Sequence, residues 1–86
     1  MKNKKKTIAQ IEAYCRKNIE DYEPMCQIAL NRIDKMRCPL DMAMPELASE
    51  IDGQIEEWAE DNELTAEQID ELMEEIDNED ILFYCQ

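Results

Sequence analysis

The sequence predicts an all-α fold, a small single-domain bundle of about four helices with a short C-terminal apolar tail. The 86 residues include only one glycine and three prolines, so few positions are marked for turns. Met, Leu, Ile, Ala, Glu and Gln dominate, whereas valine is absent and threonine occurs twice, which favours helices over strands. Apolar residues also recur at three- and four-residue steps. A chain of this length buries one modest core, so we expect a flexible basic arm over residues 1–6 and a single helical domain over residues 7–86.

The first half of the domain predicts two helices. Thr7 can cap the first, whose apolar face continues to about Asp21. That face consists of Ile8, Ile11, Cys15, Ile19 and Tyr22. Pro24 suits the first turn of the second helix, and Pro39 ends it. The second stripe consists of Met25, Ala29, Ile33 and Met36, widened by Cys26, Ile28 and Leu30.

The third helix follows a connector over residues 39–45. Either Asp41 caps this helix or Pro45 opens it at the first turn. Gly53 lies in mid-helix, which predicts either a close crossing of another helix or a bend. The apolar stripe consists of Leu47, Ile51, Ile55 and Trp58, and the helix reaches about Asp61.

The fourth helix has the clearest start. Thr65-Ala66-Glu67-Gln68 is a capping box, in which the Thr65 hydroxyl accepts from the Gln68 amide while the Gln68 side chain reaches back. Ile69, Leu72, Met73 and Ile76 form its stripe. Residues 78–80 interrupt the pattern. Residues 81–85 are either a last helical turn or a short extended tail, and we expect them to pack on the core, since five consecutive exposed apolar side chains would form a patch.

Short links predict that adjacent helices run roughly antiparallel. The expected core collects the centres of the four stripes. Its members are Ile8, Ile11, Cys15, Ile19, Ile28, Ile33, Leu47, Ile51, Ile55, Trp58, Ile69, Leu72 and Ile76.

Charge divides the chain more sharply than any other property. Residues 1–37 hold all nine basic residues and five acidic ones, whereas residues 38–86 hold 17 carboxylates and no Lys, Arg or His. Lysines 2 and 4–6, with Arg16 and Lys17, form a local basic patch, which we interpret as a solubilising tail because the net charge of −13 opposes binding to nucleic acid. Partners of the acidic half are expected to be basic.

The sequence has few of the residues and motifs on which enzymes depend, and we expect no catalytic residue and no cofactor. The absence of histidine excludes Ser-His and Cys-His pairs, and a single glycine excludes a phosphate-binding loop. Glu57-x-x-Glu60 followed by Glu74-x-x-Asp77 resembles the magnesium motif of MazG-like, all-α nucleotide pyrophosphohydrolases. That resemblance implies metal-dependent nucleotide hydrolysis. In so acidic a chain such pairs arise repeatedly, and no basic group after Arg37 could hold the nucleotide, so a solvated acidic face explains the same residues and we expect no metal site.

A second resemblance concerns calcium. Residues 65–77 resemble the opening helix of an EF-hand protein. The calcium loop that should follow needs alternating oxygen ligands and a central glycine, but Ile-Leu-Phe-Tyr follows residue 80. We therefore attribute this likeness to shared helix-start chemistry.

The four cysteines, at positions 15, 26, 38 and 85, have long and irregular spacing. We interpret Cys15 and Cys26 as small core hydrophobes, with a four-thiolate zinc site or disulfides as alternatives. No segment has the length and hydropathy of a membrane span, and no apolar stretch of a secretory signal follows the first lysines. We therefore expect a cytoplasmic protein with reduced thiols and no membrane partner.

The acidic helices provide the functional hypothesis. Residues 46–63 carry eight acids, so a helix of ~27 Å has one charge per ~3.4 Å, close to the axial spacing of charge along one DNA strand, ~3.4 Å. We predict a non-catalytic interaction protein that imitates nucleic acid and occupies the basic cleft of a nuclease or regulator, as phage-encoded inhibitors of restriction or CRISPR systems do. The expected contacts are Glu50, Glu56, Glu57, Glu60, Asp61, Glu67, Asp70, Glu71, Glu74 and Glu75.

Two alternatives stay open. A generically acidic, soluble surface would have the same composition. An antitoxin-like or adaptor module would instead use the basic arm and dock a partner through the apolar tail. A homodimer through Tyr14, Phe83 or Tyr84 is compatible with either reading.

Overall fold

The computed structural model describes residues 3–84, and in this part of the chain it contains six helices and no strand. The helices are α1 (Lys4–Asn18), α2 (Tyr22–Met36), α3 (Leu40–Ala43), α4 (Pro45–Asp61), α5 (Ala66–Glu75) and α6 (Asn78–Tyr84). The all-α class is confirmed. The predicted count of about four helices is too low because the connector contains the four-residue helix α3 and the apolar tail belongs to α6.

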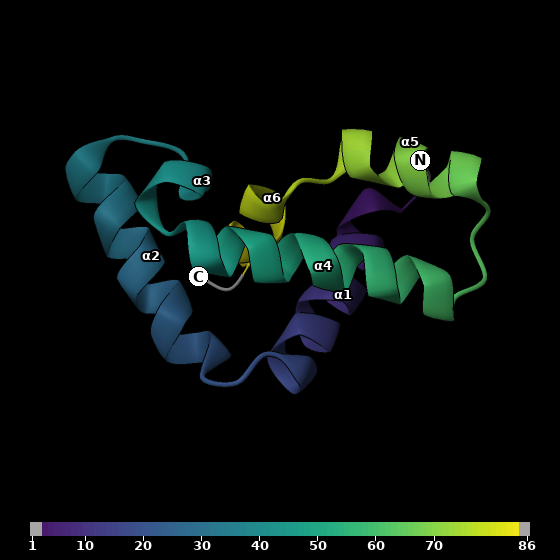
Figure 1. The fold of residues 1–86 in the computed structure, drawn as a ribbon, viewed down its shortest axis with the longest axis horizontal. Coiled ribbons are helices and arrows are strands. Elements are labelled where there is room, and N and C mark those ends of the chain that lie inside the picture. Colours follow the sequence, from purple (N-terminus) through teal and green to yellow (C-terminus); the bar gives the residue numbers. More distant parts are fainter. Residues whose placement is uncertain (1–2, 85–86) are drawn as a thin grey trace.

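The helices do not form a regular up-and-down bundle. In Figure 1, α1 and α2 are the two limbs of an open V, α4 crosses this V, and α5 returns antiparallel to α4. The prediction of antiparallel neighbours therefore holds for α4 and α5 and is wrong for α1 and α2. Between the limbs, Ile19 is extended and Asp21 has a left-handed backbone (φ 57°), so the chain is redirected without a hairpin. Asp tolerates this conformation better than most residues.

Helix α6 fills the space between the V and α4. It packs against α1, α4 and α2, and its Ile81 and Leu82 are fully buried. These side chains meet a core built from Ile11 and Cys15 of α1 and the Leu47-Ile51-Ile55 stripe of α4. The last segment of the fold is therefore at its centre.

Most of the predicted core is confirmed. Ile8, Ile33, Trp58 and Ile69 are partly buried against it, and the other predicted members except one are buried. The exception is Ile28, which is 44% exposed. Helix α2 turns its smaller side chains Cys26 and Ala29 inward, and at about 100° per residue Ile28 points away from that face.

A cap that the sequence reading overlooked starts α6. The Asp80 amide donates to Asp77 Oδ1 at 3.0 Å, and the Asp77 amide donates to Asp80 Oδ2 at 3.2 Å. This reciprocal pair has the layout of a capping box with aspartates in both roles. The predicted interruption at residues 78–80 is thus the first turn of a helix. The last-turn alternative for residues 81–85 is correct as far as Tyr84, and Cys85 lies outside the described residues.

Other predicted boundaries can be compared directly. Helix α1 begins at Lys4, three residues before the predicted cap at Thr7, so the lysines at 4–6 are helical; residues 1 and 2 of the expected arm lie outside the described part. Pro45 occupies the first turn of α4, which settles the choice against Asp41 as its cap. The capping box of α5 is confirmed, with Gln68 N to Thr65 Oγ1 at 3.2 Å and Thr65 N to Gln68 Oε1 at 2.9 Å.

The end of α4 is closed by a Schellman motif. The Leu64 amide donates to the Ala59 carbonyl at 3.1 Å, and the Glu63 amide donates to the Glu60 carbonyl at 3.0 Å. Glu63 occupies the left-handed position (φ 59°) that glycine usually takes. The motif fixes the direction in which Leu64 leaves the helix.

Cys15 and Cys26 are buried in the core, as predicted. Cys38 is partly buried, and Cys85 lies outside the described residues. Burial raises the pKa of the Cys15 thiol to about 12, with a smaller contribution from the Glu12 carboxylate. Cys15 is therefore a protonated core residue, unsuited to nucleophilic chemistry at neutral pH.

Gly53 is not explained by the close helix crossing that was one of its two predicted reasons. It is exposed, and no atom lies within 4 Å of a Cβ built on it, so no helix crosses closely there. We predict that Gly53→Ala raises the free energy of unfolding by about 0.5–1 kcal/mol, because alanine loses less backbone entropy in a helix. Urea denaturation followed by circular dichroism measures this, with Ser49→Ala on the same helix as the control. A loss of stability in Gly53→Ala would contradict the prediction.

Candidate functional site

The acids of α4 lie along its solvent side. Leu47, Ile51 and Ile55 face the core, and at 3.6 residues per turn the opposite side carries Glu46, Glu50, Glu57, Glu60 and Asp61. We call these five residues the α4 stripe. Glu56 is exposed as well and lies beside this line on the same solvent side. The α4 stripe has about one carboxylate per turn of ~5.4 Å, which is sparser than the density obtained when all acids of the helix are counted.

Helix α5 presents a second acidic surface. Leu72 is buried and Ile69 is partly buried on one side, and the exposed acids occupy the other. These are Glu67, Asp70, Glu71 and Glu74, which we call the α5 face. Glu75 was predicted to belong with them, but it is partly buried and turned toward the flank. Nine of the ten predicted contact residues are thus exposed on two adjacent helices.

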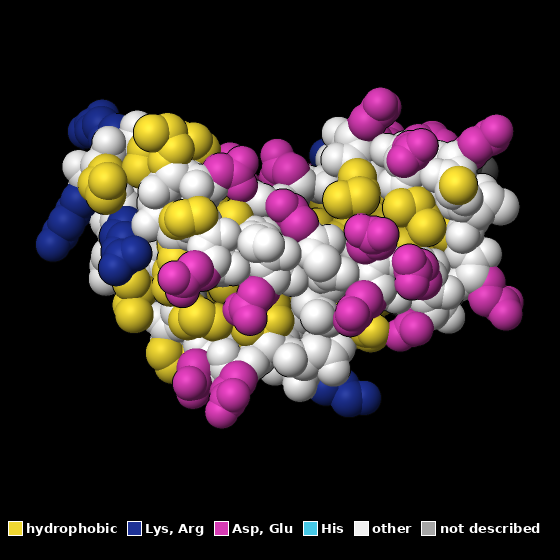
Figure 2. Space-filling view, in the orientation of Figure 1, with side chains coloured by type: hydrophobic (Ala, Val, Ile, Leu, Met, Phe, Trp, Pro, Cys, Tyr) yellow, Lys and Arg dark blue, Asp and Glu magenta, His cyan; other side chains and the backbone are white. Residues whose placement is uncertain are grey.

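Figure 2 shows how these surfaces combine. On this face, acidic side chains are spread over α4 and α5 and apolar side chains lie among them, while the Lys and Arg side chains in view lie mainly at the end formed by α2 and α3. Helix α1 carries a second basic set, Lys4, Lys5, Lys6, Arg16 and Lys17. No Lys or Arg follows Arg37, so the repulsion between carboxylates spaced at three and four positions is not relieved within α4 or α5. A cation supplied from outside would relieve it.

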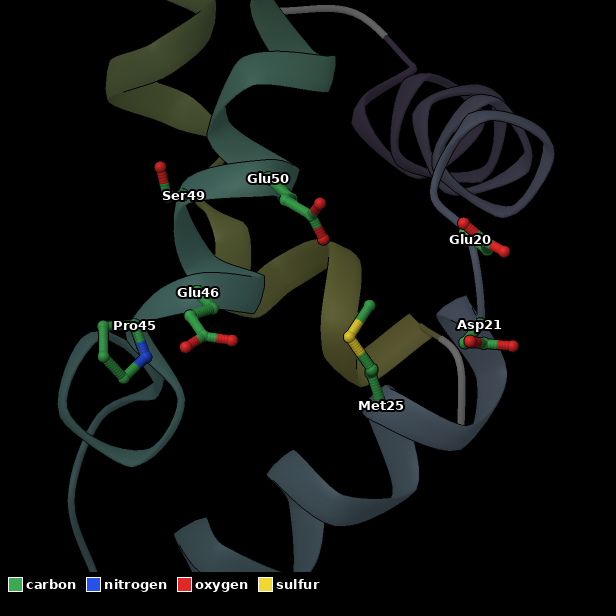
Figure 3. Close-up of a pocket in the computed structure, with 7 residues that line it drawn as sticks. All are labelled: Glu20, Asp21, Met25, Pro45, Glu46, Ser49 and Glu50. Carbon is green, nitrogen blue, oxygen red and sulfur yellow. The ribbon is translucent and has the colours of Figure 1, made fainter.

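The acidic surface extends further than the sequence predicted. An open groove of about 700 Å³ lies beside the start of α4 and is lined by Glu20, Asp21, Met25, Pro45, Glu46, Ser49 and Glu50. In Figure 3, Glu46 and Glu50 project from α4 on one side of the groove, and Glu20 and Asp21 lie on the other side. Met25 extends from α2 between them. Glu20 and Asp21 were not among the predicted contacts because they lie in the basic half of the chain. A signal was present: adjacent acids at a helix break shortly before Pro24.

Part of the acidic surface is engaged inside the fold. The Tyr14 hydroxyl donates to Asp61 Oδ2 at 2.6 Å, and this hydrogen bond is the largest cause that raises the pKa of Tyr14 to about 12. Asp61 therefore ties α4 to α1 as well as adding charge to the α4 stripe.

The basic patch predicted near the N-terminus is also partly used internally. Arg16 pairs with Glu12 and Glu23 at 2.7 Å each, and its guanidinium lies 5.8 Å from the centre of the Tyr22 ring. These contacts join α1 to α2 and leave less positive charge for an external polyanion.

A buried amide holds two carboxylates together at the α3–α4–α6 junction. Asn78 is 8% exposed, and its Nδ2 donates to Asp41 Oδ1 at 3.1 Å and to Asp52 Oδ1 at 3.1 Å. Burial raises the pKa of Asp52, and the Asp41 and Asp77 carboxylates raise it further, whereas the hydrogen bond from Asn78 lowers it. Desolvation is the dominant cause, so the charged form of Asp52 opposes folding.

The hydrolase motif is not assembled. Glu57 and Glu60 lie on α4, Glu74 lies on α5, and Asp77 caps α6. Within residues 3–84, no group of three or more His, Cys, Asp or Glu side chains could hold a metal ion. The geometry therefore gives the magnesium motif no support.

Comparison with known proteins adds no relative. No protein-family model, no curated protein and no solved structure matches this chain. In the part of the chain that the structure describes, no helix combines the length and apolar character needed to cross a bilayer.

We predict that Asp52→Asn stabilises the fold at pH 7. Because its pKa is raised, Asp52 holds its proton more tightly in the folded state than in the unfolded state. Protonation of Asp52 therefore stabilises the fold at low pH, and this stabilisation is lost as pH rises through the folded-state pKa. Asparagine cannot ionise, so the fold is not destabilised as pH rises. Its side-chain carbonyl can still accept the hydrogen bond from Asn78. Urea denaturation from pH 8 downward should show an advantage that narrows as pH falls through the raised pKa.

Glu56→Gln, an exposed change on the same helix, is the control for general charge reduction. An equal stabilisation by Glu56→Gln, or an Asp52→Asn advantage that does not vary with pH, would show that burial of Asp52 is not the cause.

Proposed function

We propose that this protein is a non-catalytic binding protein whose α4 stripe and α5 face engage a basic surface on a partner protein. The single observation that supports this most is the exposure of ten acidic residues on two adjacent helices that carry no basic residue. Ordinary acidic helices interleave Lys or Arg at four-residue spacing, which relieves the repulsion. Here the relief has to come from outside these two helices, from other parts of the fold, from salt ions or from a partner.

The most specific form of the proposal is nucleic-acid mimicry. A cleft that binds phosphates with Lys and Arg would be attracted to two neighbouring acidic helices, and release of counterions would favour association. The α4 stripe alone is less dense than a nucleic-acid strand, so the mimic uses both helices and the acids of the groove at the start of α4. The partner class is a nuclease or regulator, of the kind that phage-encoded inhibitors block.

Salt dependence tests the electrostatic proposal. We expect the partner captured from cells to dissociate as NaCl rises from about 50 mM to about 500 mM. Glu57→Gln on the α4 stripe should weaken binding several-fold, whereas Asp34→Asn, which removes one exposed charge from α2, should leave it unchanged. Nucleic acid should compete for the same partner. Binding that is indifferent to salt, or a partner without a basic cleft, would refute the proposal.

A second candidate is an adaptor that docks through apolar side chains. Phe83 and Tyr84 at the end of α6 are 43% and 52% exposed, and Met42 of α3 is 70% exposed. If this reading is correct, Phe83→Ser should abolish capture of the partner while Glu57→Gln has no effect. The same pull-down therefore separates the two candidates, because the opposite pattern supports the electrostatic one.

A further inference from the structure

The outward side of α2 carries an exposed stripe of mixed character. Pro24, Ile28, Arg32 and Lys35 follow one another at three- and four-residue steps, so they lie on one side of the helix, and all four are exposed. We call these residues the α2 outer stripe. The side chains that α2 sends into the core lie on another side of the helix, and Figure 1 shows α2 at the edge of the molecule.

Ile28 lies near the middle of this stripe. The sequence predicted it to be a core residue, but it is 44% exposed. Basic side chains follow it. The Arg32 guanidinium donates to the Ala43 carbonyl at 3.2 Å, whereas no ion pair within the described residues involves Lys35 or Arg37. A single exposed isoleucine is ordinary, so the charges around it have to identify what could cover it.

Charge changes sign along α2. Glu20 and Asp21 directly precede the helix, Lys35 lies in its last turn, and Arg37 follows it. Two copies of α2 packed antiparallel on their outer stripes would place the acidic start of each helix against the basic end of the other. The same packing would bring the two Ile28 side chains together near a two-fold axis. Antiparallel packing also sets the positive end of each helix macrodipole beside the negative end of the other.

The net charge of the chain does not oppose this contact strongly. Residues 20–37 contain four acidic and three basic residues, a net charge of −1, although the whole chain carries −13. The α5 face lies toward the other end of a molecule 37 Å long, and at ~0.15 M ionic strength exposed charges are screened beyond about 8 Å. A polyanion would be repelled by the start of α2 and a basic protein by its end, so a second copy of this chain fits best.

We propose that two copies of this protein form a homodimer through antiparallel packing of their α2 outer stripes. The contact is isologous, because each copy supplies both the acidic start and the basic end of α2. The α5 face of each copy lies away from this contact. The dimer therefore neither requires nor prevents the binding function proposed above, and the two can fail separately.

Sedimentation equilibrium of the full chain measures the association. In about 0.15 M NaCl, between about 10 µM and about 1 mM protein, we expect a monomer–dimer equilibrium with a Kd of the order of 100 µM, as suits a small interface. Ile28→Ser should weaken dimerisation at least about tenfold, because the change occurs twice in the dimer. Met73→Ser on α5 removes an apolar side chain of similar exposure (39%) and should leave the Kd unchanged.

A charge exchange tests the antiparallel direction. Arg37→Asp should weaken dimerisation several-fold, since it turns an attraction into a repulsion at both ends of the contact. Adding Asp21→Arg to the same chain restores both the net charge and the complementarity, so the double variant should dimerise within about threefold of the unaltered chain. Both positions have a left-handed backbone (φ 57° and 51°), so the exchange makes similar demands on the two ends of α2.

A chain that stays monomeric over the whole concentration range would overturn the proposal, as would a main product larger than a dimer. So would equal effects of Ile28→Ser and Met73→Ser, or a double variant that dimerises as weakly as Arg37→Asp alone. If Phe83→Ser weakens the dimer as much as Ile28→Ser does, the interface belongs to α6 and the proposal is wrong. Circular dichroism checks that every variant keeps its helices, which we expect because the altered side chains are exposed.

Discussion

The packing of the six described helices depends on the burial of α6 between α1 and α4. Helices α4 and α5 commit their outer sides to charge, so their apolar sides need a dense core to offset the repulsion. Ile81 and Leu82 supply its centre, and each fully buried side chain of this kind contributes about 1.5–3 kcal/mol. The reciprocal aspartate cap starts this seven-residue helix, and the amide of Asn78 fastens it to Asp41 and Asp52.

Some carboxylates of this molecule lie where the helix macrodipole stabilises them, and others lie where it does not. Glu46, Glu67 and Glu79 lie in the first turns of their helices, where the macrodipole favours carboxylates. Glu60 and Glu75 lie at or near the opposite ends, where it disfavours them.

Sequence patterns predicted the long elements well because long amphipathic stripes and strong caps leave little choice. The Leu47-Ile51-Ile55 stripe and the Thr65–Gln68 box are examples. These patterns failed where packing between helices determines which side chains are buried. Ile28 is more apolar than Cys26 and Ala29, yet α2 turns the small residues inward so that it can approach α6 and α4. Helix α6 escaped notice because aspartate is an unusual partner in the second position of a capping box.

The candidate site shows the same division between local and tertiary information. Exposure of Glu57, Glu67 and Glu74 followed from the opposite apolar stripes, which is local information. The groove that joins Glu20 and Asp21 to Glu46 and Glu50 required the fold, since it brings together residues 25 to 30 positions apart.

The central place of α6 also bears on how the chain is made. A ribosome synthesises α1 to α5 before residues 78–82, so the emerging polypeptide lacks the side chains that complete its interior. Until those residues leave the exit tunnel, α1 and α4 can contact each other, but the core between them lacks Ile81 and Leu82. The interior is consequently completed only once α6 is available to enter it.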